Sequence, residues 1–65
     1  MIQTYTRENC SKDEAKEQAR NLFYEKDNMI LSVVLFRDKH CEITVDTDGN
    51  TPLSRRSGIP EIAFA

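Results

Sequence analysis

The chain has 65 residues, with nine basic side chains against eleven acidic ones and a formal net charge of −2. This length allows a single small domain, residues 1–65, built around one core. The charge is not the strongly basic balance typical of nucleic-acid-binding domains. No stretch approaches the roughly 20 apolar residues of a membrane span, and the start "MIQTYTREN" lacks the basic and apolar regions of a secretory signal. We therefore expect a cytoplasmic protein with no membrane partner.

The first two predicted elements are a short strand and a helix. Residues 2–6 alternate and are rich in β-branched and aromatic side chains, as strands are. Ser11, followed three residues later by Glu14, has the capping-box pattern of a helix start. The Asp–Asn pair at 27–28 predicts the helix end, since Asn tolerates the left-handed conformation found there. Apolar residues at i, i+4, i+7 and i+8 form the stripe that we expect to face the core: Ala15, Ala19, Leu22 and Phe23.

Two more strands and a tail follow. "MILSVVLFR" predicts a strand over 29–37, and "CEITVD" predicts an alternating strand over 41–46 that is joined to it by a hairpin turn. In the tail, 58–65, Pro60 lacks a backbone donor, so an edge strand is possible there only from about Glu61. The sequence thus predicts an α+β fold of order strand–helix–strand–strand. One amphipathic helix packs on a small, mainly antiparallel sheet, and in one alternative the tail adds a short fourth strand.

The strand over 29–37 is apolar on both sides. Strict alternation places Met29, Leu31, Val33 and Leu35 on one side and Ile30, Ser32, Val34 and Phe36 on the other. A single helix covers only one face of a sheet, so the second apolar face needs another cover. The alternatives are the chain's own tail, a second copy of the chain, or another protein.

This apolar surplus indicates a non-enzymatic interaction module. We expect it to bind itself as a homodimer, or another protein, through the open sheet face and the tail, because exposed apolar patches mark interaction sites. By analogy of size, one form of this hypothesis is an inhibitor of a host protein, as phages and mobile elements encode. The predicted interaction surface consists of Ile30, Val34, Phe36, Ile59, Ile62 and Phe64.

A nucleic-acid-binding domain is the alternative function. Its predicted contacts are Arg37 and Lys39 at the hairpin turn and Arg55 and Arg56 after the last turn. Basic side chains at such tips contact phosphates in strand-based readers of DNA and RNA. Asp38, which stands between Arg37 and Lys39 in "RDKH", and the overall negative charge argue against this alternative.

The segment "VDTDGNTPLSRR" has the first half of a calcium-loop pattern. Asp46, Asp48 and Asn50 stand at the first, third and fifth ligand positions of an EF-hand loop. Thr51 replaces the glycine that bends such a loop, and Ser57 replaces the glutamate that closes the coordination shell. We therefore interpret "TDGN" as a turn and predict no metal site.

The two cysteines and the single histidine do not predict catalysis. His40 and Cys41 are neighbours at a strand start, where consecutive side chains point to opposite faces. Together with Cys10 they fall short of the four ligands of a structural zinc site. In a reducing cytoplasm we expect two free thiols. The sequence indicates no catalytic residue, no cofactor and no small-molecule ligand.

Overall fold

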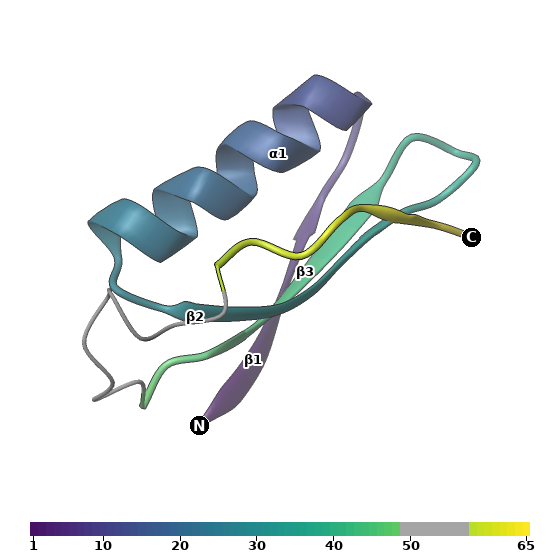
Figure 1. Cartoon of the computed structure of the whole chain (residues 1–65). Coiled ribbons are helices and arrows are strands. Elements are labelled where there is room, and N and C mark those ends of the chain that lie inside the picture. The colour runs from purple at the N-terminus through teal and green to yellow at the C-terminus, as the bar shows by residue number, and fades with distance from the viewer. Residues whose placement is uncertain (49–57) are drawn as a thin grey trace.

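The protein is a helix packed on one face of a four-stranded sheet (Figure 1). The computed structural model describes residues 1–48 and 58–65. The elements in chain order are β1 (Ile2–Arg7), α1 (Lys12–Arg20), η1 (Asn21–Glu25), β2 (Met29–Leu35), β3 (Cys41–Asp46) and β4 (Ala63–Phe64).

The strand order is β1-β3-β2-β4, and β3 pairs antiparallel with both β1 and β2. β4 comes from the C-terminal segment and pairs parallel with β2. The predicted α+β architecture is confirmed, including the fourth strand. Figure 1 shows this segment, in yellow, running along the sheet beside β2.

The helix begins where the capping pattern predicts. The hydroxyl oxygen of Ser11 accepts a hydrogen bond from the backbone N–H of Glu14 at 3.2 Å, and the Glu14 carboxylate lies 3.4 Å from the same hydroxyl. This bond satisfies one of the free N–H groups of the first turn. On the predicted core stripe, Ala15 and Ala19 are fully buried and Phe23 is 4% exposed.

The helix ends in a wider turn than the sequence predicts. In η1 the N–H of Lys26 bonds to the carbonyl of Asn21, five residues back, which is π-helical geometry. Asp27 then takes the left-handed conformation, with φ 59°, and the N–H of Asn28 bonds to the carbonyl of Leu22. The predicted end is thus at the right place, but the left-handed residue is Asp27 and not Asn28.

A bulge in β2 changes which side chains face the helix. In the register with β3, Ile30 pairs with Val45 and Ser32 pairs with Thr44, which leaves Leu31 as the extra residue. An extra residue reverses the alternation of the side chains beyond it. The expectation that Ile30 lies on the open face is therefore wrong: it is 2% exposed beneath the helix, whereas Leu31 is 42% exposed.

The hydrophobic core lies between α1 and the central strands. Its largest fully buried side chains are Ile43, Val33 and Val45. Ile59 and Ile62 of the C-terminal segment are half-buried against the margin of this core. The chain therefore uses its own tail to close the helix side of the sheet, and not the opposite face.

Truncating the two neighbouring side chains at the bulge tests its position. We expect Ile30→Ala to lower the free energy of unfolding by about 2–5 kcal/mol, because it leaves a cavity in the core. Leu31→Ala should cost less than about 1 kcal/mol, because much of that side chain is already in water. Urea denaturation followed by circular dichroism measures both values. Ile30→Val, with an expected cost of about 0.5–1.5 kcal/mol, keeps the comparison measurable if the alanine variant unfolds. A larger loss from Leu31→Ala would contradict the bulge.

Candidate functional site: a groove between α1 and the C-terminal segment

The sheet face turned away from α1 is more polar than the sequence predicts. The strand register places these residues on it: Ile2, Thr4, Thr6, Met29, Ser32, Val34, Glu42, Thr44 and Asp46. The hydroxyls of Thr4 and Thr44 lie 3.2 Å apart. Hydroxyl and carboxylate groups make up most of this face. It does not carry the apolar surplus expected from strict alternation.

The predicted interaction surface is divided over several parts of the fold. Val34 is half-buried on the open face, and Phe36 is half-buried in the hairpin, where its ring stacks on His40 at a centroid distance of 4.2 Å. Ile30 is buried beneath the helix, and the three tail residues of that surface lie together at the margin of the same side. Ile59 and Ile62 pack against the core, and Phe64 is 66% exposed.

These tail residues line a groove along α1. A hollow of about 350 Å³ has the buried Ala19 and Val33 in its floor. Its other lining residues are Lys16, Arg20, Tyr24, Ile59, Pro60, Glu61 and Ile62. A second hollow of about 310 Å³ shares Lys16, Glu61 and Ile62 with the first and adds Lys12 and Phe64. The two hollows adjoin at these shared residues, and we refer to them together as the helix–tail groove.

One wall of the helix–tail groove is basic. Lys12, Lys16 and Arg20 are spaced four residues apart, so they form one row along the helix surface, and all three are exposed. Within residues 1–48 and 58–65, no carboxylate forms an ion pair with any of them. The Nζ atom of Lys12 lies 6.0 Å from the centre of the Phe64 ring. The row therefore presents positive charge beside the apolar Ala19 and Val33. Glu61 also lines the groove, and Asp13 and Glu17 share a neighbouring hollow with Lys16 and Arg20.

An exposed aromatic ring lies toward each end of the helix–tail groove. Phe64 is next to Lys12 at one end, and Tyr24, 63% exposed, lines the groove beyond Arg20 at the other. Tyr and Arg are enriched among the residues that dominate binding energy at protein interfaces. The arrangement suits a ligand that has both apolar and negatively charged groups.

The sequence-predicted nucleic-acid contacts are only partly within the described residues. Arg37 and Lys39 are exposed in the turn between β2 and β3, and Lys39 takes φ 66° there. Arg55 and Arg56 lie outside the described residues. Asp38 sits between the two turn cations. Nucleic-acid binding through these four residues stays a prediction.

Asp38 is held by the histidine that follows the turn. Its carboxylate bonds to Nδ1 of His40 and accepts the backbone N–H of His40 at 3.1 Å. The side-chain bond, followed by the backbone bond, lowers the pKa of Asp38 from its ordinary 3.8. The carboxylate that separates the two cations is therefore fixed by the turn itself.

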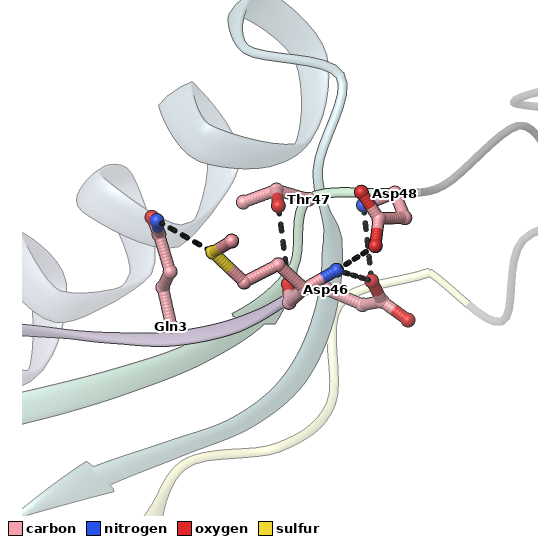
Figure 2. Close-up of polar contacts among 5 residues, drawn as sticks. Gln3, Asp46, Thr47 and Asp48 are labelled. Atoms are coloured by element: carbon pink, nitrogen blue, oxygen red, sulfur yellow. Dashed lines mark hydrogen bonds and ion pairs between the residues drawn. The ribbon is translucent and has the colours of Figure 1, made fainter.

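Two residues of the calcium-loop-like segment, Asp46 and Asp48, contact the amino group of Met1. Figure 2 shows the carboxylates of Asp46 and Asp48 turned toward it; the amino group of Met1 lies 3.3 Å from Asp46 Oδ1 and also bonds to Asp48. The backbone N–H of Asp48 donates to Asp46 at 3.0 Å, and this bond is the largest cause that lowers the pKa of Asp46. Asn50 lies outside the described residues. In the part of the chain that the structure describes, no three His, Cys, Asp or Glu side chains are grouped to hold a metal ion.

No protein-family model, curated protein or solved structure matches this chain. Among the described residues, no helix has the length and apolar character needed to cross a bilayer.

A titration tests the electrostatics of the hairpin turn. We expect the pKa of Asp38, followed by carboxyl NMR, to lie below 3.8 and to return toward that value in His40→Asn. Because the folded-state pKa is the lower one, the contribution of this carboxylate to stability is present above 3.8 and is lost as the pH falls through the folded pKa. Asp38→Asn should remove that part of the acid dependence of unfolding. An ordinary pKa with His40 in place would contradict the bond.

Proposed function

We propose that this chain is a small, non-enzymatic, cytoplasmic binding module that holds an extended segment of another protein in the helix–tail groove. The bound segment alternates acidic and apolar side chains. The observation that carries the proposal is the row Lys12, Lys16 and Arg20, without ion-pair partners among the described residues, along an apolar floor.

The spacing of the cations matches that of an extended peptide. Residues four apart on a helix are about 6 Å apart along its axis. In an extended chain, alternate residues point the same way and are about 6.6 Å apart. Three acids at alternate positions would therefore each meet one cation of α1. The apolar residues between them would point the other way, toward Ile59 and Ile62.

The apolar contacts supply most of the expected affinity. An exposed ion pair contributes only about 0–1 kcal/mol, whereas burying one Val or Leu side chain contributes about 1.5–3 kcal/mol. Ordering a flexible peptide opposes these gains. We expect weak binding, with a dissociation constant on the order of micromolar. The cations select acidic partners, and the apolar contacts hold the segment in the groove.

Self-association is a second candidate function that one observation favours. Among the described strands, β1 pairs only with β3, so its outer edge has no strand partner. A free edge is a template for pairing with another chain. A homodimer formed through β1 would leave the helix–tail groove open, so the two modes of binding can be measured separately.

A labelled peptide of alternating Glu and Val tests the proposal by fluorescence anisotropy. We expect micromolar binding that weakens as sodium chloride is raised, and at least a tenfold loss of affinity in Lys16→Glu/Arg20→Glu. The matched control is Lys26→Glu/Lys39→Glu, which makes the same change of net charge at exposed positions outside the groove. It should bind nearly as well as the unsubstituted chain.

Three results of the same experiment would contradict the groove. These are equal losses in the two double variants, equal binding of a Lys–Val peptide, and tighter binding of a single-stranded oligonucleotide than of the Glu–Val peptide. The last would favour the nucleic-acid alternative. Sedimentation equilibrium over a range of chain concentrations measures the homodimer independently.

A further inference from the structure

The two cysteines are in contact inside the protein. Cys10 is 2% exposed and Cys41 is fully buried, and the thiol of Cys41 donates a hydrogen bond to the sulfur of Cys10 at 3.1 Å. Both thiols are free. Their separation is only about 1 Å more than the roughly 2.05 Å of a sulfur–sulfur bond. A covalent bond between them needs a small side-chain movement.

Backbone contacts hold both cysteines in place. Asn9 takes the left-handed conformation, with φ 50°, and turns the chain inward after β1. The N–H of Cys10 then bonds to the carbonyl of Lys39 at 2.6 Å, two residues before Cys41. Arg7 is the direct partner of Cys41 in the sheet register. The two cysteines are thus held together by the same contacts that join β1 to the hairpin.

We propose that Cys10 and Cys41 are an oxidation site, at which a peroxide converts the two thiols into a disulfide within the chain. A hollow of about 390 Å³ leads to it, and Cys10 is the cysteine in its lining. The other lining residues are Asn9, Ser11, Glu14, Leu35, Phe36 and Lys39. Of the two cysteines, Cys10, 2% exposed, is therefore the one that a molecule as small as hydrogen peroxide would meet first, since Cys41 is fully buried.

The reaction balances with one peroxide for each disulfide. The Cys10 thiolate attacks one peroxide oxygen and breaks the O–O bond, and the other oxygen leaves as water after taking up a proton. The resulting sulfenic acid is attacked at sulfur by Cys41, which displaces the hydroxyl group as a second water. In total, two thiols and one hydrogen peroxide give one disulfide and two waters. An external dithiol reverses the bond by exchange.

The surroundings of Cys10 make this reaction slow. Burial raises the pKa of the Cys10 thiol to about 12, and the close contact with the Cys41 thiol and the charge of Glu14 act in the same direction. Little thiolate therefore exists at neutral pH, and the thiolate is the species that peroxide oxidises.

The disulfide would tie the start of α1 to β3. The loop that it closes contains α1 and β2, which provide the basic wall and part of the floor of the helix–tail groove. Closing a loop of this length stabilises a fold mainly by restricting the unfolded chain. For a domain of this size we expect the melting temperature to rise by at least about 10 °C.

The test uses the full chain, reduced and then freed of reductant, in native buffer with hydrogen peroxide. We expect an intact mass lower by two hydrogens, a proteolytic peptide that links Cys10 to Cys41, and a higher melting temperature that dithiothreitol reverses. Cys10→Ala should show no such rise. The linked peptide from the unsubstituted chain decides the question even if this variant folds poorly.

Three other results would overturn the proposal. One is a sulfinic acid at Cys10 while Cys41 stays a thiol. Another is a disulfide between two chains, detected as a doubled mass that depends on concentration. The third is a Cys10–Cys41 bond that forms in urea but not in native buffer. None of these results bears on peptide binding, because neither cysteine lines the helix–tail groove.

Discussion

The packing of a single helix on the two central strands is the constraint on which the rest of the structure depends. Ala15 and Ala19 are small and fully buried, which lets α1 lie close to Val33 and Ile43. One helix can shelter only one face of a sheet. The chain meets this limit with the bulge in β2, which turns Ile30 inward and leaves the opposite face mostly to hydroxyl and carboxylate groups.

The same constraint accounts for the helix–tail groove. The helix covers the middle of the apolar face, and the margin beside β2 is left to the C-terminal segment. Ile59 and Ile62 fill that margin only partly, so a hollow persists between them and the cations of α1. Two of the exposed large apolar side chains, Tyr24 and Phe64, lie at this groove beside the cations of α1, whereas Met1, Ile2 and Leu31 are exposed elsewhere.

Local patterns predicted most of the fold and little of the site. The cap at Ser11 and the strand at 41–46 follow from neighbouring residues alone, and the structure has both. The bulge at Leu31 was not predicted, because strict alternation assumes that every residue of a strand has a partner in the neighbouring strand. The row of cations from Lys12 to Arg20 is visible in the sequence. That it lines a groove depends on where the C-terminal segment packs, which the sequence does not show. The contact between the cysteines joins residues 31 positions apart, which no local pattern reports.

The short pairing of β4 determines how the far wall of the groove behaves. Only Ala63 and Phe64 pair with β2, and one further backbone bond joins Ala65 to Leu35. A segment held by so few bonds detaches at a small fraction of the free energy needed to unfold the sheet. Its amide hydrogens should exchange with solvent long before those of β3. Parting of Ala63 and Phe64 from β2 would change the width of the groove while the rest of the domain stays folded.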